Sequence, residues 1–331
     1  MNISTHIEHW PFHTPFSITG HTFDGIDVLV VTVESGKLRG RGEATGVYYH
    51  GETAQSMAAQ LQDFTGSPQD FSRLELLNLL PPGGARNALD CALWELEAQQ
   101  VGQAVWQLAG LTAATPLLTT YTLGATDPAT MAGRARNFTA ARALKLKLIG
   151  DGGDAERVSA VRAARPDVWI GVDANQGFDR DSFHALLPTL VDARVQLVEQ
   201  PFPIGRESDL DGLNSPIPIA ADESVQDRHD LAAVIGRVDV INIKLDKCGG
   251  LTEALAMVAD VRRAGLKLMV GNMVGTSLSA AAGFVLGQFC DLVDLDGPMF
   301  LSEDRLPSVH YSDGNITCPD LVWGSATLRA N

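Results

Sequence analysis

The sequence predicts an α/β protein built around a closed parallel β/α barrel, and three observations support this fold class. From about residue 118, short apolar runs alternate with longer amphipathic stretches. There are eight such runs, which fits a closed (β/α)8-type barrel better than an open sheet. Ionisable residues stand near the ends of six of the eight runs, at the end of the barrel where active sites are built.

The part before the barrel, residues 1–115, has a mixed pattern. IDVLVVTVESGKLRGRGEA (26–44) predicts two strands around a turn at Ser35-Gly36. Residues 83–110 carry apolar side chains at helical spacing and predict one or two helices. GRGEATG (40–46) misses the glycine spacing of a dinucleotide-binding loop by one residue, so we interpret it as a turn. An open doubly wound sheet is therefore only the second choice.

The barrel strands are predicted from the apolar runs, and crossover helices are predicted from the stretches between them. DAERVSAVRAARP (154–166) and GGLTEALAMVADVRRAG (249–265) are examples of such helices. The eight runs are TTYTLGA (119–125), ALKLKLI (143–149), WIGVDAN (169–175), VQLVEQ (195–200), IPIAADES (217–224), VDVINIKLD (238–246), KLMVGNM (267–273) and LVDLD (292–296).

Composition limits the classes of partner. The 331 residues include 25 Lys and Arg against 40 Asp and Glu, a net charge of −15, which argues against nucleic acid or an anionic membrane as partner. No apolar run approaches the ~20 residues of a membrane span, and the N-terminus has no signal-peptide pattern. No two of the 4 cysteines form a zinc-type pair. We therefore expect a cytoplasmic protein with reduced thiols.

Two lysines occupy one face of an otherwise apolar strand. In LKLKLIG (144–150), side chains alternate across the strand, so Lys145 and Lys147 point together, away from the leucines. Either lysine alone could protect a sheet edge from aggregation. At the end of a barrel strand, both are predicted to face the inside of the rim, where anions surround them.

Three carboxylates follow on the next three strands. Asp173, Glu199 and Asp222 each stand at a strand end, about one β/α unit apart, so they should meet at one mouth of the barrel. Three buried carboxylates would repel one another, and a divalent cation removes that repulsion. Oxygen ligands with no His or Cys nearby favour Mg²⁺. Asn175, two residues beyond Asp173, could support these ligands.

Lys147 and Lys244 come from the second and sixth strands, so we expect them to face each other across the mouth with the metal between. A substrate carboxylate on the metal would present its α-carbon to both amines. Nearby positive charge, from Lys145 and the metal, would lower the pKa of a lysine and make it a base. Two bases on opposite faces predict racemisation or epimerisation. Each feature alone is ordinary, but six strand ends in register favour a functional site.

At these residues the chain resembles the enolase superfamily, in its muconate-lactonizing-enzyme-like subgroup, and within it the dipeptide epimerases of the Ala-Glu type. The resemblance covers nearly the whole chain. It implies a modified TIM barrel, (β/α)7β, over residues 116–302, an α+β capping domain over 1–115, and a tail over 303–331 that returns to the cap. The matching stretches are LKLKLIG, GVDANQGF, LVEQP, ADES, NIKLDKCGG and DLDGP.

The resemblance also implies the role of each site residue. Asp173, Glu199 and Asp222 would bind one Mg²⁺ per subunit. Lys147 and Lys244 would be the acid/base pair, with Lys145 tuning Lys147. Asp294 and Asp296 would pair with the N-terminal ammonium of a dipeptide substrate, as two carboxylates opposite a metal favour a cation. The inverted centre would be the α-carbon of the C-terminal residue, and the family also suggests a homo-oligomer.

One departure concerns the cap loops. Ala-Glu epimerases carry an Arg in the first cap loop, but FSITGHTFDGID (16–27) has none and offers Thr19, His21 and Asp24 instead. The second loop, GVYYHGET, offers Tyr48, Tyr49 and His50. Thr19, His21 and His50 are the candidates for substrate contacts, and strict Ala-Glu specificity is not expected. An apolar, aromatic or cationic second residue is the alternative.

Two other readings remain open. The first is another lyase or isomerase of the superfamily, such as a muconate cycloisomerase, an o-succinylbenzoate synthase or N-succinylamino acid racemase, or a sugar-acid dehydratase. Asp294 and Asp296 argue against these, and MVGNM (269–273) lacks the His that dehydratases use. The second is a non-catalytic, metal-stabilised barrel, which would have no need of two opposed lysines.

Overall fold

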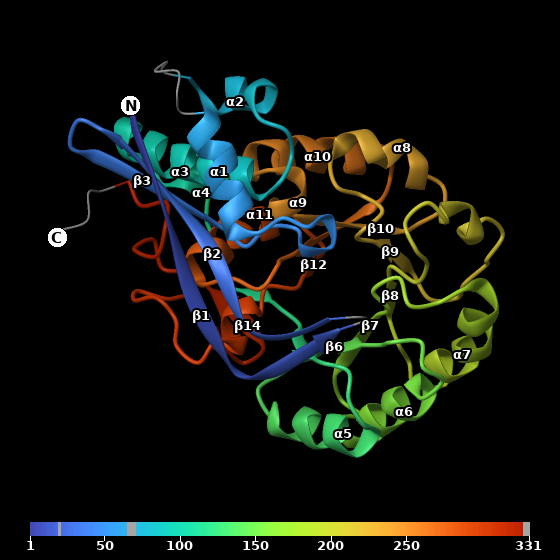
Figure 1. The fold of residues 1–331 in the computed structure, drawn as a ribbon. Coiled ribbons are helices and arrows are strands. Elements are labelled where there is room, and N and C mark those ends of the chain that lie inside the picture. Colours follow the sequence, from blue (N-terminus) through green and yellow to red (C-terminus); the bar gives the residue numbers. More distant parts are fainter. Residues whose placement is uncertain (19–20, 65–70, 327–331) are drawn as a thin grey trace.

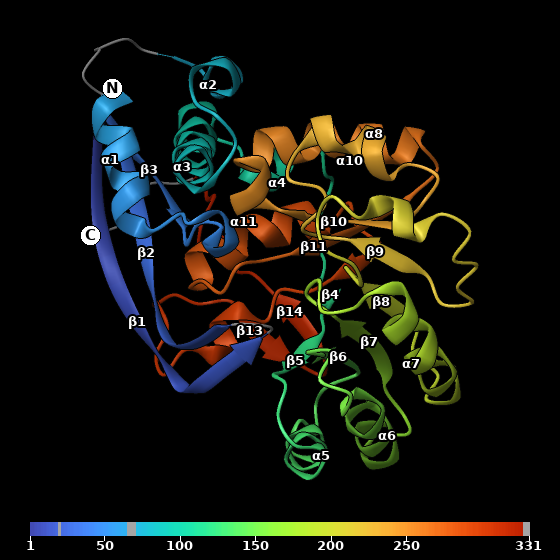
Figure 2. The ribbon, with the colours of Figure 1, turned by 45° about the vertical axis from the view of Figure 1, so that its right-hand side comes forward.

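The computed structural model describes residues 1–18, 21–64 and 71–326. It contains a three-stranded antiparallel sheet with its helices and an eight-stranded parallel sheet with its helices. Figures 1 and 2 show the antiparallel sheet along one side of the molecule and the parallel sheet on the other. The predicted fold class, a β/α barrel with an α+β cap, is confirmed. The boundaries at residues 115 and 302 stay predictions.

The capping sheet has the order β1 (Asn2–Ile18), β2 (His21–Ser35), β3 (Leu38–Ala44). The two strands predicted around Ser35-Gly36 are confirmed as β2 and β3, while β1 was not foreseen. Gly36 has φ +62°, the left-handed conformation that this tight turn requires. The helices of the cap are α1 (Ala54–Phe64), α2 (Arg73–Leu79), α3 (Gly84–Val101) and α4 (Val105–Leu108).

Strand β3 lies directly on helix α3, and its glycines make this possible. A Cβ added at Gly40 would lie 1.9 Å from the carbonyl oxygen of Ala92, and one at Gly42 would lie 2.0 Å from that of Ala88. The interpretation of residues 40–46 as a turn was therefore wrong for residues 40–44, which continue β3. The glycines there serve close strand–helix packing instead of a turn.

Helix α3 joins the cap to the barrel, and 14 of its 18 residues are buried. The Arg86 guanidinium donates to the carbonyl oxygens of Gly249 (3.1 Å) and Cys248 (2.6 Å) in the barrel. Asp90 accepts from the backbone N–H (3.0 Å) and hydroxyl (2.5 Å) of Thr252. These buried polar contacts fix the orientation of the cap over the barrel.

The barrel strands follow one another in space as they do along the chain, which is the order expected of consecutive right-handed β/α units. All eight predicted strands are present. They are β5 (Tyr121–Leu123), β6 (Ala143–Lys147), β7 (Trp169–Asp173), β8 (Leu197–Glu199), β9 (Ile219–Ala221), β10 (Val240–Lys244), β11 (Lys267–Gly271) and β12 (Leu292–Val293). The helices of this part are α5 (Pro128–Asn137), α6 (Asp154–Ala164), α7 (Arg180–Asp192), α8 (Leu231–Val234), α9 (Leu245–Cys248), α10 (Leu251–Arg263) and α11 (Ser277–Gly287).

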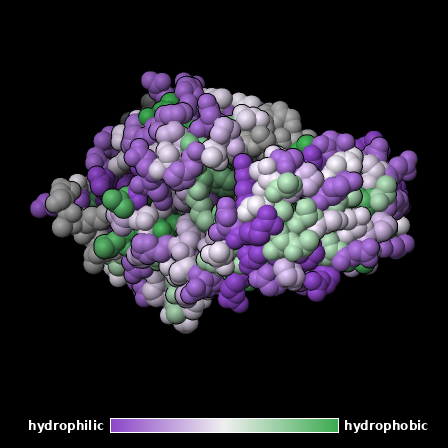
Figure 3. Space-filling model, turned by 90° about the horizontal axis from the view of Figure 1, so that it is seen from below, coloured by the Kyte–Doolittle hydropathy of each residue, from purple (hydrophilic) through white to green (hydrophobic). Residues whose placement is uncertain are grey.

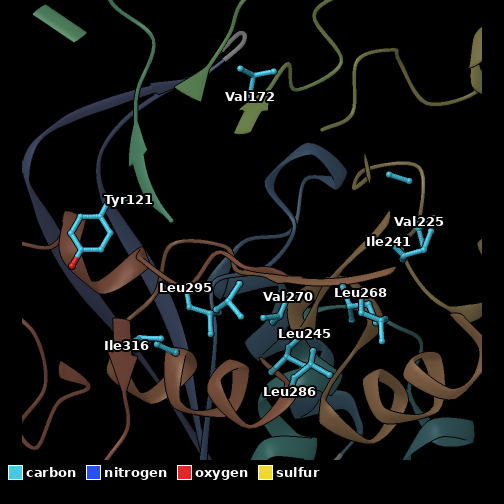
Figure 4. Close-up of a cluster of buried hydrophobic side chains, with 14 of the residues drawn as sticks. Tyr121, Val172, Val225, Ile241, Leu245, Leu268, Val270, Leu286, Leu295 and Ile316 are labelled. Carbon is cyan, nitrogen blue, oxygen red and sulfur yellow. The ribbon is translucent and has the colours of Figure 1, made fainter. Parts of the chain in front are cut away.

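Alternation along the strands divides the barrel into two environments. Outward side chains pack against the surrounding helices: Figure 4 shows Leu268 and Val270 of β11 beside Leu245 and Leu286 of the helices. Inward side chains near the strand beginnings form a separate apolar cluster. This cluster is the barrel floor and consists of Leu197, Ala220, Val240 and Met269.

The tail beyond the barrel contacts the barrel and the cap. Strands β13 (His310–Ser312) and β14 (Asn315–Thr317) pair with each other, and β14 pairs with β4 (Leu117–Leu118). Arg305 donates to the buried carboxylate of Glu43 on β3 (2.9 Å). The face in Figure 3 is mostly hydrophilic, with small separate hydrophobic patches. Among the helices of residues 1–18, 21–64 and 71–326, none is long and apolar enough to cross a membrane.

Candidate active site

The inward positions one step above the barrel floor carry ionisable side chains. On β6 the inward residues are Lys145 and Lys147, and on β7 the inward residue at the strand end is Asp173. Parallel pairing places Lys147 opposite Asp173, and Asp173 opposite Glu199. The strand register therefore brings together side chains that are 26 positions apart in the chain.

Asp173, Glu199 and Asp222 form the acidic cluster of this site. Each offers one carboxylate oxygen, and the three oxygens lie within 4.8 Å of one another. All three residues are at most 1% exposed. Burial and then repulsion from Asp173 raise the pKa of Glu199 to about 8, while Lys145 and Lys147 outweigh burial and hold the pKa of Asp173 below its usual range. The cluster is a divalent-metal site by its donor chemistry.

Lys145 lies at the centre of the acidic groups. Its Nζ is 2.7 Å from Glu199, 2.8 Å from Asp294 and 3.1 Å from Asp173. Burial alone would lower its pKa, but these carboxylates outweigh burial and raise the pKa of Lys145 well above its usual value. The carboxylates around Lys145 therefore favour its charged form.

Lys147 and Lys244 lie against different carboxylates of the cluster. Lys147 Nζ donates to Asp173 Oδ2 (2.6 Å), and Lys244 Nζ donates to Asp222 Oδ2 (2.6 Å). Burial lowers the pKa of Lys244, but Asp222 overcomes it, and the net shift is well upward. The predicted lowering of a base lysine's pKa includes the charge of the metal and so stays a prediction; the carboxylates of the protein act in the opposite direction on the pKa of Lys244.

Three residues that sequence reasoning did not assign complete the site. Lys247 has no exposed side-chain surface and donates to Asp222 Oδ1 (2.6 Å) and to the carbonyl oxygen of Asn242 (3.0 Å). Asn242 donates to Glu199 Oε1 (2.8 Å) from the inward position two residues before Lys244. Glu223 accepts from Asn175 Nδ2 (3.1 Å). Two sequence signals could have found Lys247 and Asn242. Lys247 follows Lys244 by one helical turn, and Asn242 lies on the same face of β10 as Lys244 because side chains alternate along a strand.

Asp294 and Asp296 follow β12 and reach the first barrel strand. Asp294 accepts from Lys145 and from the Thr120 hydroxyl. Asp296 Oδ2 accepts from the backbone N–H of Thr122 on β5 (2.5 Å). Burial and repulsion from Asp294 raise the pKa of Asp296 to about 7. Among the described residues, no lysine makes an ion pair with Asp296, whereas Lys145 contacts Asp294, so a cationic ligand would be favourable beside Asp296.

A cavity of about 120 Å³ opens between the barrel and the cap. Lys147 and Lys244 both line it, together with Asn175 and Glu223. Its remaining walls are largely apolar or aromatic and include Phe12, Phe23, Ile26, Tyr48, Tyr49, Met273 and Val274. Both predicted bases therefore reach the same enclosed space.

Of the cap-loop residues, the tyrosines line the cavity and His50 does not. His50 is exposed, and its ring contacts that of Tyr49 in a tilted arrangement, with ring centroids 4.8 Å apart and an interplanar angle of 57°. His50 is not among the residues lining the cavity. Tyr48 and Tyr49 line the cavity in its place, and Tyr48 packs edge-on against Phe23 (5.6 Å). Thr19 and the side chain of His21 lie outside the described residues. The substrate contacts predicted for these three residues stay predictions.

The charges of the site and its unpartnered oxygens fit a bound divalent cation. Six buried carboxylates face four buried lysines, so two negative charges remain uncompensated when all groups are ionised. The carboxylates are Asp173, Glu199, Asp222, Glu223, Asp294 and Asp296, and the lysines are Lys145, Lys147, Lys244 and Lys247. Glu223 Oε2, Asn175 Oδ1 and Asn242 Oδ1 are buried with no hydrogen-bond partner among the described residues. A doubly charged cation balances this excess.

Comparisons with known proteins agree with this geometry. Residues 1–110 match the sequence profile of the mandelate racemase / muconate lactonizing enzyme N-terminal domain, and residues 129–323 match the enolase C-terminal domain-like profile. The chain is 38% identical over 311 residues to L-Ala-D/L-Glu epimerase of Escherichia coli strain K12, covering 93% of this chain and 97% of the relative.

Two solved structures show the same fold. An enolase family member from Agrobacterium tumefaciens, with homology to dipeptide epimerases and with bound sodium and L-Ala-L-Glu, superimposes with a TM-score of 0.93 at 38% identity, over 97% of this chain and 99% of that chain. A dipeptide epimerase from Methylococcus capsulatus, complexed with Mg and L-Arg-D-Lys, gives a TM-score of 0.89 at 32% identity, over 95% and 96% of the two chains.

A capped β/α barrel with an acidic triad and lysines on two facing strands defines an isomerase of the mandelate racemase and muconate lactonizing enzyme type. More narrowly, the chain belongs to the dipeptide epimerase family of the enolase superfamily.

Proposed function

We propose that this protein is a Mg²⁺-dependent dipeptide epimerase that inverts the α-carbon of the C-terminal residue by a two-base proton transfer. The observation that carries the proposal is that Lys147 and Lys244 line one cavity from β6 and β10, each beside a different carboxylate of the acidic cluster. Three strands separate β6 from β10, so the two amines approach a substrate from different sides.

Asp173, Glu199 and Asp222 would hold the metal. A bound Mg²⁺ supplies Lewis acidity toward a substrate carboxylate and positive charge that lowers the pKa of nearby lysines. Lys145, held as a cation by three carboxylates, stabilises negative charge that develops beside it. These residues account for the acidification of an otherwise weakly acidic C–H bond.

The proton moves between the substrate and two lysines. One neutral amine, on Lys147 or Lys244, removes the α-proton and becomes an ammonium. The ammonium on the opposite side returns a proton to the same carbon with inverted configuration and becomes the neutral amine. The charges of the pair are exchanged, so the reverse direction uses the same residues in swapped roles.

Asp296 and Asp294 support recognition of a free N-terminal ammonium. Asp296 is buried, bonded to the β5 backbone and free of a direct lysine contact, so a cation beside it offsets repulsion from Asp294. An N-acylated amino acid has no ammonium to offer at this position, which favours a dipeptide over an N-succinyl substrate.

The second residue of the dipeptide is proposed to be apolar or aromatic. The cavity that holds Lys147 and Lys244 is walled by Phe23, Ile26 and Tyr48 of the cap. An apolar side chain held there buries surface without leaving a charge unpaired. This preference agrees with the lack of an Arg in residues 16–27.

The test incubates the purified protein with Mg²⁺ in D₂O and a library of L,L-dipeptides. Deuterium should enter the C-terminal residue, and the D-configured product should accumulate. Lys147→Met and Lys244→Met should each lower the epimerisation rate by about 10²–10⁴-fold, the usual contribution of a general acid or base. One of them can retain deuterium exchange from a single face.

The matched control is Lys267→Met. Lys267 is the exposed first residue of β11, at the opposite end of that strand from the site, so the rate should not change. Full activity of either site variant would refute the two-base mechanism. Consumption of an N-succinyl amino acid or a muconate, with no exchange in any dipeptide, would refute the proposed reaction class.

A further inference from the structure

A second cavity, of about 280 Å³, lies beside Asp296 and outside the cavity of the two lysines. Thr122 and Asp296 form its barrel wall. Arg134, Asn137 and Phe138 of α5 line another side, and Phe300 contributes an aromatic wall. The backbone N–H of Thr122 holds the Asp296 carboxylate in place at 2.5 Å. The cavity is therefore attached to the residue proposed to bind the substrate ammonium.

The charges in this cavity are of opposite sign. Asp296 is 5% exposed and carries the negative charge. Arg134 is exposed, and its guanidinium makes no ion pair or hydrogen bond with any residue that the structure describes, although its carbonyl accepts from the Phe138 N–H. His13, also on the lining, is the other titratable group facing the space. An arginine without a partner at the edge of a cavity is available to a ligand anion.

The covalent structure of a dipeptide can bring its groups to both Asp296 and Arg134. The α-carbon of a dipeptide's N-terminal residue bears both the ammonium and the first side chain. If Asp296 holds the ammonium, the first side chain starts within one bond of that point and enters the adjoining cavity. A space of about 280 Å³ is far larger than an alanine methyl needs.

We propose that this cavity is the subsite for the first residue and that it selects an acidic side chain, with Arg134 binding the side-chain carboxylate while Asp296 binds the ammonium. The inference rests on the proposed dipeptide epimerase function and adds the substrate class: dipeptides that begin with Glu or Asp. Planar guanidinium–carboxylate pairing gives the subsite its preference over a neutral first residue.

The experiment measures kcat/KM for three dipeptides that begin with L-Glu, L-Ala or L-Lys. Their second residue is the one that exchanges fastest in the D₂O library. The wild-type order should be Glu above Ala above Lys. Arg134→Met should lower kcat/KM for the Glu dipeptide about fivefold, the upper range for an exposed ion pair, and leave the Ala dipeptide unchanged. Arg134→Glu should reverse the order of Glu and Lys.

Arg136→Glu is the matched control. Arg136 is exposed on the same helix but does not line the cavity, so the variant carries the same charge change and should keep the wild-type order. Equal use of Ala and Glu dipeptides, or an equal loss on all three in Arg134→Glu, would overturn the proposal while leaving epimerisation intact. Failure of every dipeptide to exchange would instead overturn the underlying function.

Discussion

Removal of the Arg305 side chain should destabilise the protein, and more so at high pH. The Glu43 carboxylate is fully buried and accepts from Arg305 Nε (3.1 Å) and Nη2 (2.9 Å), and from the Thr276 backbone N–H (2.7 Å). Arg305 also contacts Glu8 and lies over the Trp10 ring at 5.2 Å. In Arg305→Ala, a buried carboxylate loses its counter-charge.

The loss of folding stability can be calculated from the protonation of the Glu43 carboxyl. Burial already raises the pKa of Glu43 above its ordinary 4.5, and loss of the arginine raises it further. A carboxyl group kept protonated in the folded state costs up to about 1.4 kcal/mol for each pH unit above its unfolded pKa, or about 5 kcal/mol at pH 8 and below 1 kcal/mol at pH 5. The wild-type carboxyl already carries part of this cost, so with the lost packing we expect a loss of about 4 kcal/mol at pH 8, within the usual range for a broken buried ion pair, and a loss of about 1–2 kcal/mol at pH 5.

Urea unfolding at both pH values, followed by circular dichroism and tryptophan fluorescence, measures this difference. Arg305→Ala with Glu43→Gln should recover much of the pH 8 loss, because an amide needs no counter-charge. Arg263→Ala, which removes an exposed arginine paired with Asp260, is the control and should unfold like the wild type. Equal destabilisation of Arg305→Ala at pH 5 and pH 8 would show that the reasoning about Glu43 is wrong.

Three further predictions concern the contact between cap and barrel, the packing of β3 on α3, and the metal site. Burial raises the pKa of Asp90 to about 6, so folding favours its protonated form. The free energy of unfolding should therefore fall as pH rises from about 4 to 6. Asp90→Asn should remove roughly 3 kcal/mol of that fall, measured by parallel urea titrations. Gly42→Ala should lower the unfolding temperature sharply or prevent folding, because its Cβ meets the α3 backbone, whereas Gly133→Ala, in an open position within α5, should raise it slightly. Glu199→Gln should weaken Mg²⁺ binding in calorimetry at least tenfold, and unchanged affinity would remove Glu199 from the ligand set.

The barrel could be predicted because its signals are local. Each strand is a short apolar run, and the position of Asp173 or Lys244 at the end of its run gives both the face and the height of the side chain. Strand β1 gave no such signal, since NISTHIEHWPFHTPFSI mixes polar residues and prolines without regular alternation. It forms because β2 offers it a paired edge, and that edge is a tertiary feature.

The supporting residues of the site were harder to predict than its central ones. Lys247 lies in the short helix after β10, and its role follows from where that helix points its ammonium. Arg134 was not singled out, because its position beside Asp296 depends on how α5 packs across from β12. Such long-range placement comes from loop geometry and packing, which a single sequence does not encode in any local pattern.

The apolar floor of Leu197, Ala220, Val240 and Met269 shuts the lower end of the barrel to water. A hydrogen taken from a substrate by Lys147 or Lys244 therefore exchanges with solvent through the cavity above the floor, which Tyr48 and Tyr49 of the cap line in part. In a two-base transfer, the hydrogen removed from the substrate stays on the lysine that removed it, and the product receives its hydrogen from the other lysine. An isotopic label at the α-carbon therefore reports how fast that lysine exchanges with solvent: label recovered in the substrate means slow exchange, and label lost to the medium means fast exchange.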